Sequence, residues 1–417
     1  MDSDSAFAGF ACEDCGREHG DTVTRGRCAD CGGPLAGRYD LDELDGLADA
    51  VGGGRGMYRY DALLPVDRES AVSLGEGGTP LVEAPALAGE VGVARLAVKD
   101  EGQNPTGTAA DRGASLFAAA ARDAGAERVA LASPGDDGQS VAAYAARAGL
   151  EARVFVPSRA GFVRKAMVNV HGADMRVIGG RLGDAVGAFE EAREERTGDH
   201  PQSPALDASP AATPYRVEGA RTALFEVVED LSGPALAGDG PGAGTAGEPN
   251  PPDAVVVPVG TGVTLVGLHR AARHLHELGV IDALPALHAV QPAGCAPVVD
   301  AHREGATSVD AVASPDTIVG ELEVADPPAG DSALAAVAET GGDAVAVNDD
   351  DALAAGAAVA SREGVEVGAT GAVAAAGVHA LADAGAFDPD DTVVLVNPTA
   401  GNKDGDVLRS YLMSQGV

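Results

Sequence analysis

The chain has 417 residues, of which 45% are hydrophobic and only 3% are aromatic, and its formal net charge is −35. This length favours two or three domains, and the scarcity of aromatic side chains requires a core of Ala, Val and Leu. The strong negative charge would repel nucleic acid and anionic membranes, so we exclude both as partners. No uncharged apolar run is long enough to span a bilayer, and the N-terminus lacks the features of a signal peptide, so we expect a cytoplasmic protein.

Acidic residues are spread along the whole chain, and most of the 29 basic residues are arginine. Such a composition is typical of the solvated surface of a protein from a high-salt cytoplasm, so we predict a halophilic protein. An acidic tail that binds a basic partner is the alternative, but no block of five like charges supports it. The only lysines are Lys99, Lys165 and Lys403.

Four of the five cysteines form two Cys-x2-Cys pairs, Cys12 with Cys15 and Cys28 with Cys31. Each pair can present two thiolates on one turn, and two such turns close a tetrahedron around Zn²⁺. Disulfides are the alternative, but a reducing compartment argues against them. Four thiolates leave no open coordination position, so we predict a structural zinc ribbon over residues 1–45 and no catalytic metal.

The ribbon is followed by residues 41–70, which are polar and glycine-rich and are predicted to be a connector. Farther along, short apolar runs alternate with alanine-rich helical segments, and this order predicts parallel sheets with helices on both faces. The predicted helices are 114–124, 140–148 and 164–171, and the clearest strands are 128–132, 152–156, 175–178, 254–257, 287–290 and 392–396.

Residues 231–253 interrupt this order with a stretch rich in Gly, Pro and Ala. It contains too few apolar side chains to offset the entropy of ordering the chain, so we predict a flexible insertion there. We assign no site to it.

Several motifs along the chain occur together in one family. They are residues 74–81 (Leu-Gly-Glu-Gly-Gly-Thr-Pro-Leu), 99–102 (Lys-Asp-Glu-Gly), 104–113 (Asn-Pro-Thr-Gly-Thr-Ala-Ala-Asp-Arg-Gly), 215–222 (Tyr-Arg-Val-Glu-Gly-Ala-Arg-Thr), 289–297 and 397–404. Together they resemble threonine synthases and their relatives among the fold-type-II pyridoxal-phosphate (PLP) enzymes. The resemblance implies two α/β lobes with the site in a cleft at the strand ends, a large lobe of 46–105 with 215–417 and a small lobe of 106–214.

The most informative stretch is Asn104–Gly113. The family reads Asn-Pro-Thr-Gly-Ser-Phe-Lys-Asp-Arg-Gly here, and its lysine holds PLP as a Schiff base. In this chain Ala109 and Ala110 stand where the family has phenylalanine and lysine. An alanine cannot form an imine, so we assign no catalytic residue. Lys99 lies eleven residues upstream, and a strand could bring it toward the site.

The resemblance also implies a phosphate nest at Gly260, Thr261, Gly262, Val263 and Thr264. A glycine-rich turn between a strand and a helix presents N–H groups and a helix dipole to an anion. A plain tight turn is the alternative. Val263 stands where the family has a small residue, and a β-branched side chain at positive φ would crowd the nest.

Two further positions should contact the cofactor ring. Asp136 replaces the family's asparagine, which donates to the phenolic oxygen, whereas a carboxylate only accepts. Asp136 could instead belong to a surface turn, because Pro-Gly-Asp-Asp is favourable turn chemistry. Thr399 could face the pyridine nitrogen or serve as a turn hydroxyl.

These losses fall at one site, while the zinc ligands and the scaffold motifs are kept. We therefore predict a degenerate threonine-synthase-like protein, a pseudoenzyme that binds PLP non-covalently at best. It would bind a small phosphorylated or amino-acid-like ligand, or regulate a related enzyme in a homo- or hetero-oligomer. The alternatives are a PLP-dependent lyase or threonine synthase of amino-acid biosynthesis with a non-standard site, and an interaction scaffold built on the zinc ribbon.

Overall fold

The computed structural model describes residues 5–44, 46–195, 205–233, 250–414 and 416. They form two compact units, Met1–Gly78 with Ala110–Thr222 (unit 1) and Thr79–Ala109 with Ala223–Val417 (unit 2). The lobe limits inferred from the resemblance stay a prediction. Within the described part of the chain, no helix combines the length and the apolar content needed to cross a bilayer.

Unit 1 begins with a small antiparallel sheet in the order β2-β1-β3. Cys12 is the last residue of β1, and Leu35, the first residue of β3, pairs with it. The side chains of Cys12, Cys28 and Leu35 form a small buried cluster of their own. The strands are β1 (Phe7–Cys12), β2 (Glu18–His19) and β3 (Leu35–Tyr39).

The segment after the ribbon is more ordered than the predicted connector. It contains η1 (Leu41–Glu43), α1 (Leu47–Ala50) and η2 (Met57–Leu63). Met57, Tyr58 and Leu64 are buried in the main core of unit 1. The prediction of a connector rested on the glycines and charged residues of 41–70 and overlooked these large apolar side chains. Their burial holds the segment against the core.

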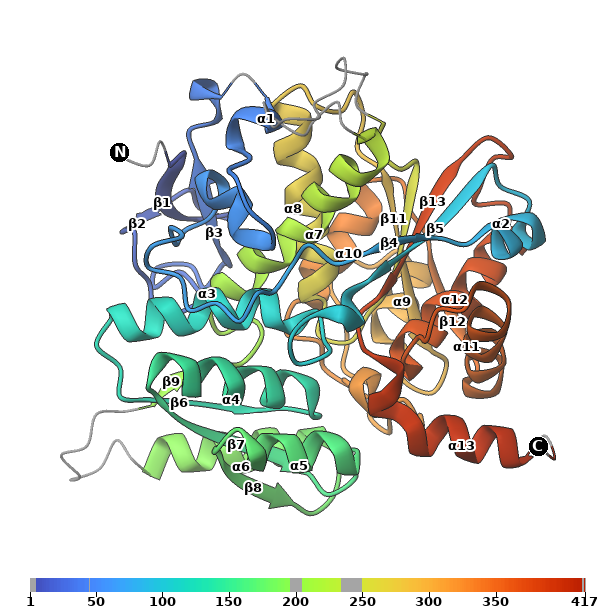
Figure 1. The fold of residues 1–417 in the computed structure, drawn as a ribbon. Helices are drawn as coiled ribbons and strands as arrows, with labels where there is room; N and C mark the ends of the chain where they lie inside the picture. The colour runs from blue at the N-terminus through green and yellow to red at the C-terminus, as the bar shows by residue number, and fades with distance from the viewer. Residues whose placement is uncertain (1–4, 45, 196–204, 234–249, 415, 417) are drawn as a thin grey trace. The chain divides into compact units, whose positions relative to one another are not determined.

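The rest of unit 1 is a parallel four-stranded sheet in the order β8-β7-β6-β9, with helices on both faces (Figure 1). α3, α4 and α5 share one core with the sheet, and α6 packs through Phe189 against a second core on the other face. The elements are α3 (Ala110–Asp123), β6 (Arg128–Ala132), α4 (Asp136–Ala148), β7 (Glu151–Pro157), α5 (Phe162–Val170), β8 (Asp174–Ile178), α6 (Leu182–Glu195) and β9 (Leu206–Asp207).

Unit 2 is built on a six-stranded sheet in the order β12-β11-β10-β13-β5-β4, in which only the edge strand β4 is antiparallel. The apolar helix α12 packs against one face together with α2 and α11. The elements are β4 (Leu81–Glu83), α2 (Pro85–Val91), β5 (Arg95–Asp100), η3 (Glu101–Gln103), β10 (Ala254–Pro258), α8 (Val263–Glu277), β11 (Ala286–Pro292), α9 (Pro297–Glu304), η5 (Gly320–Leu322), α10 (Gly330–Glu339), β12 (Ala344–Val347), α11 (Asp349–Glu363), α12 (Ala369–Asp383), β13 (Thr392–Asn397), η6 (Gly401–Asp404) and α13 (Gly405–Ser414).

The predicted α/β class with parallel sheets and flanking helices is confirmed. Helix α7 (Tyr215–Ser232) continues from unit 1 into unit 2. In the predicted insertion 231–253, α7 extends to Ser232, and residues 234–249 lie outside the described residues.

Candidate functional site

The four N-terminal cysteines meet at one point of unit 1. The Sγ atoms of Cys12 and Cys31 are 3.4 Å apart, those of Cys15 and Cys28 are 3.8 Å apart, and all four lie within 4.8 Å of one another. Four sulfurs around Zn²⁺ at about 2.3 Å would be spaced by roughly 3.8 Å, whereas a disulfide would require about 2 Å. This donor set fits a closed tetrahedral metal site.

In unit 2, three neighbouring parallel strands carry predicted site residues just beyond their carboxyl ends. Strand β10 leads into Gly260–Thr264, β13 leads to Thr399, and β5 leads into 104–109. β13 pairs with β10 on one side and with β5 on the other, so these segments leave the same edge of the sheet. Ligands of open α/β sheets bind at this edge.

The segment 104–109 runs beside the turn that holds Thr399. Thr108 forms an antiparallel bridge with Thr399, and the Ala109 N–H donates to the Pro398 carbonyl at 2.9 Å. The Ala400 N–H donates to the Gly107 carbonyl at 3.0 Å. Thr399 is therefore buried against the segment that precedes Ala110.

The side chain of Lys403 also lies in this region. A Cβ atom at Gly107 would be 3.6 Å from its Cδ and Cε atoms, and the φ angle of Gly107 is +76°. Lys403 lies in one of the family-like motifs, but nothing in the sequence predicts that it lies near residues 104–109. Its position depends on the bridge between segments almost 300 residues apart.

The glycine-rich turn after β10 is a tight backbone crossing. Gly262 has φ +88°, and a Cβ atom there would lie 2.8 Å from the Ala329 carbonyl oxygen. The Ala329 N–H donates to the Thr261 carbonyl at 3.0 Å. Among the described residues, the N–H groups of Val263 and Thr264, in the first turn of α8, have no hydrogen-bond partner. The turn therefore keeps the donors that an anion would need.

The expectation that Val263 takes a positive φ angle is wrong. Val263 is the first residue of α8, and no described non-glycine residue has a positive φ. Gly262 takes the left-handed conformation instead. The β-branched side chain is therefore compatible with the backbone of the turn.

In unit 1, Ala110 opens α3, and its neighbours are tightly held. Asp111 accepts a hydrogen bond from the Ser140 hydroxyl at 2.5 Å, and the Arg112 guanidinium donates to the Thr222 hydroxyl at 2.8 Å. Both Asp111 and Arg112 are buried. The start of the helix is well formed, and residue 110, which the resemblance aligns with the family's lysine, is an alanine without an amine.

Asp136 is not part of a surface turn, because it is buried in the first turn of α4. Arg164 of α5 binds its carboxylate with two bonds, Nε to Oδ1 at 2.9 Å and Nη2 to Oδ2 at 3.3 Å. The next residue, Asp137, pairs with the buried Arg216. Sequence reasoning missed Arg164, because only the packing of α4 on α5 brings it to Asp136.

The side chain of Lys99 is buried in unit 2 and takes part in a network of ion pairs and hydrogen bonds. Its ammonium group lies 2.8 Å from a Glu226 carboxylate oxygen and donates to the Thr79 carbonyl at 2.7 Å. The Thr79 hydroxyl in turn donates to Glu101 at 2.6 Å. These contacts give Lys99 a structural role and argue against its use as a substitute for the missing lysine.

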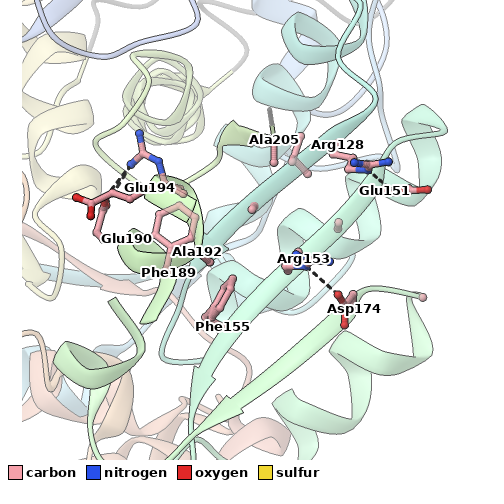
Figure 2. Close-up of a pocket in the computed structure, with 15 residues that line it drawn as sticks. Arg128, Glu151, Arg153, Phe155, Asp174, Phe189, Glu190, Ala192, Glu194 and Ala205 are labelled. Atoms are coloured by element: carbon pink, nitrogen blue, oxygen red, sulfur yellow. Dashed lines mark hydrogen bonds and ion pairs between the residues drawn. The ribbon is translucent and has the colours of Figure 1, made fainter. Parts of the chain in front are cut away.

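A cavity of about 640 Å³ opens elsewhere in unit 1, between α6 and the sheet (Figure 2). Phe155 and Phe189 form its apolar floor, and the exposed ion pairs Arg128–Glu151 and Arg153–Asp174 lie at its rim. No predicted site residue is among the described residues that line it. We attach no function to this cavity.

Comparison with known proteins agrees with this arrangement. The profile described as "Pyridoxal-phosphate dependent enzyme" matches residues 72–399. Threonine synthase of Methanosarcina acetivorans is 30% identical over 92% of this chain and 89% of its own length, and threonine synthase of Methanocaldococcus jannaschii is 32% identical over 90% and 88%.

Solved structures share the fold at lower identity. Maize serine racemase matches with a TM-score of 0.64 and 19% identity, covering 81% of this chain and 92% of its own. A lysine-to-alanine variant of O-ureido-L-serine synthase bound to O-ureido-L-serine matches with a TM-score of 0.62 and 18% identity, covering 82% and 96%. Taken with the motifs and the sheet order, these matches show that the chain belongs to the pyridoxal-phosphate dependent enzyme family and is threonine-synthase-like.

Proposed function

We propose that this chain is a threonine-synthase-like protein that has lost the family's lysine chemistry and binds a small phosphorylated or amino-acid-like anion. The observation that carries the proposal is Ala110, which stands at the lysine position in an otherwise intact helix start. Such a protein would act by binding, or by regulating a related enzyme in a homo- or hetero-oligomer.

Some of the residues that the resemblance assigns to PLP suit the cofactor, and others do not. The turn Gly260–Thr264 offers unpartnered N–H groups at a helix N-terminus, which suits a phosphate. In unit 1, Ala110 has no amine for a covalent bond to the aldehyde. Asp136 cannot donate to a phenolate, and its carboxylate is already held by Arg164. PLP would therefore be held without a covalent bond, and we derive no reaction through it.

Loss of a lysine does not by itself prevent a protein of this fold from holding an amino acid. The variant of O-ureido-L-serine synthase that carries a lysine-to-alanine change is described as bound to O-ureido-L-serine. By analogy, an amino-acid-like anion is a reasonable ligand class for this chain.

The decisive experiment uses the purified protein, PLP and borohydride. We expect no borohydride-stable adduct on any lysine by peptide mass spectrometry. PLP should show at most saturable, reversible binding, and a phosphomonoester should compete with it. The variant Ala110→Lys is the matched positive control, because it restores an amine at the family position. A stoichiometric lysine adduct in the natural chain would overturn the proposal.

The alternative of an enzyme with a non-standard site rests on Lys403. Its side chain lies beside Gly107, in the same segment as Ala110. An adduct on Lys403 that disappears in Lys403→Arg, and persists in the exposed control Lys165→Arg, would favour this alternative over the binding protein.

We also propose that the four cysteines hold one structural Zn²⁺. Their spacing in the sequence and the mutual proximity of their four sulfur atoms support this assignment. Elemental analysis should find one zinc per chain in the natural protein and none in Cys12→Ser/Cys28→Ser. One zinc per chain in that double variant would contradict it.

A further inference from the structure

One contact between the small cysteine-bearing sheet and the rest of unit 1 is made by a carboxylate of helix α7. The Gly37 N–H in β3 donates to Glu218 Oε1 at 3.0 Å, and the Tyr39 hydroxyl donates to Glu218 Oε2 at 2.8 Å. A side chain at Gly37 would come within 2.9 Å of Glu218 and of the Tyr39 ring. Glycine at 37 thus allows the strand to approach Glu218 closely.

Arg221 completes this contact. It lies one turn after Glu218, binds the same carboxylate at 2.5 Å and places its guanidinium 4.4 Å from the centre of the Tyr39 ring. It also donates to the Leu63 carbonyl at 3.2 Å. Burial and the neighbouring Glu218 charge raise the pKa of Tyr39 well above its usual value, so the phenol remains a donor.

A second contact joins the ribbon to the start of α7. The ring of Phe10 in β1 meets the ring of Tyr215 edge to face at 5.2 Å, and the Val23 N–H donates to the Tyr215 hydroxyl at 3.4 Å. The ribbon therefore contacts the first turn of α7 twice, at Tyr215 and at Glu218. Both contacts come from strands or turns next to the cysteines.

The same part of α7 packs directly on the start of α3. A Cβ atom at Gly219 would lie 2.4 Å from the Arg112 carbonyl oxygen, and one at Gly113 would lie 2.7 Å from the Arg216 Cα atom. Arg112 also donates to Thr222. A chain of buried contacts thus leads from the ribbon through Glu218 and α7 to the helix turn that begins with Ala110.

We propose that the ribbon is a metal-dependent clamp on the junction of α7 and α3, with Glu218 as its positioning residue. The cluster around the cysteines is only Cys12, Cys28 and Leu35 with part of Val23, while Phe10 of the same sheet packs into the main core of unit 1. Because this cluster is so small, we expect the cysteine turns to need the metal in order to fold. Loss of the metal would release Gly37 and Tyr39 from Glu218 and leave a buried carboxylate with fewer donors. The start of α3 would then loosen. This inference holds whether or not the chain is a pseudoenzyme.

Hydrogen–deuterium exchange of the full chain tests the clamp. After the metal is removed with a chelator, we expect amide exchange to become faster by about tenfold or more in peptides covering 108–120 and 215–224, as well as in the ribbon. Peptides from α12 in unit 2 serve as the internal control and should not change. Normal protection at 108–120 in the metal-free protein would overturn the proposal.

A second variant separates the clamp from general loss of the ribbon. Glu218→Gln should keep its full metal content, because no cysteine is touched, and should still show faster exchange at 108–120. Arg38→Gln is the control, since Arg38 lies in β3 between Gly37 and Tyr39 and its side chain is exposed. If Glu218→Gln exchanges like the natural chain while holding zinc, Glu218 does not transmit the effect.

Discussion

At the residue scale, Asp136 stands where the resemblance implies an asparagine, and its buried carboxylate needs a neighbouring cation. Asp136 is buried at the start of α4, where a carboxylate is favoured by the helix dipole but is costly without a partner. Arg164 supplies two bonds to it. The sequence predicted the loss of a donor, but not this pair, because the residues are 28 positions apart on different helices.

The pair makes a direct prediction about stability. Arg164→Gln should lower the free energy of unfolding by about 3 kcal/mol, because it leaves a buried carboxylate without its cation. The double variant Asp136→Asn/Arg164→Gln should recover most of this loss. Guanidinium unfolding of the natural chain, both single variants and the double variant gives the coupling energy. If the two changes simply add, the pair does not neutralise Asp136.

Because of His288 in strand β11, we expect the folded protein to lose stability in acid. Burial lowers the pKa of its imidazole to about 4, although the nearby Asp343 opposes this shift. Its Nδ1 accepts a hydrogen bond from the Asp343 N–H at 3.0 Å, and His302 contacts the Asp343 carboxylate at 3.1 Å. Since the folded pKa lies below the unfolded value of about 6.5, the unfolded chain binds more protons between these two values.

The stability contributed by neutral His288 is therefore complete above about pH 6.5 and is lost as the pH falls toward 4, by up to about 3 kcal/mol. His288→Asn keeps an acceptor for the Asp343 N–H but cannot be protonated. Its unfolding free energy should fall less steeply between pH 6.5 and 4 than that of the natural chain. Parallel pH profiles of the two proteins would exclude this contribution.

At the scale of elements, the sequence predicted types better than limits. The alternation of apolar runs and alanine-rich segments correctly indicated the parallel strands, because buried strands need continuous Val, Leu and Ala. The helices α3 and α4 begin earlier than predicted, at Ala110 and Asp136. Their first turns contain Asp and Gly, which are common both in turns and at helix starts, so composition could not separate the two.

The turn between β10 and α8 shows the same limit. The sequence correctly predicted a glycine-rich turn between a strand and a helix, but assigned the difficult backbone position to Val263 instead of Gly262. Which residue takes the positive φ depends on the Ala329 backbone, which crosses the turn from a distant segment. Local sequence contains no information about that crossing.

Two glycines that flank α8 allow a matched test of this crossing. Gly262→Ala should destabilise the protein by about 2–3 kcal/mol, because the new Cβ meets the Ala329 carbonyl and the backbone has φ +88°. Gly279 has φ +66° and open space around an added Cβ atom, so Gly279→Ala should lower the free energy of unfolding by only about 1 kcal/mol. Equal losses in urea unfolding would mean that Ala329 yields without cost.

At the scale of the whole molecule, the family and the α/β class could be predicted because six separated motifs agree with one fold. The positions of Lys99 and Lys403 could not be predicted from the sequence. Lys99 is buried with Glu226, whereas Lys403 lies beside Gly107, and both positions follow from strand pairing between distant parts of the chain. A departure from a family motif can be read from the sequence, but the contacts around it are seen only in the three-dimensional structure.

The net charge of −35 makes a prediction about the molecule as a whole. Like charges repel over the Debye length, which shrinks from about 10 Å at 0.1 M salt to about 3 Å at 1 M. The folded chain holds these charges closer together than the unfolded chain does, so added salt should stabilise it. We expect the midpoint of thermal unfolding to rise by roughly 5 °C between 0.1 and 1 M KCl. For a chain of this length, that shift corresponds to an increase of at least about 2 kcal/mol in the free energy of unfolding. Sucrose at equal osmolality is the control, because it does not screen charge. A midpoint that rises equally in sucrose would assign the effect to solvent exclusion, and one that stays constant in KCl would show that charge repulsion does not limit the stability of this protein.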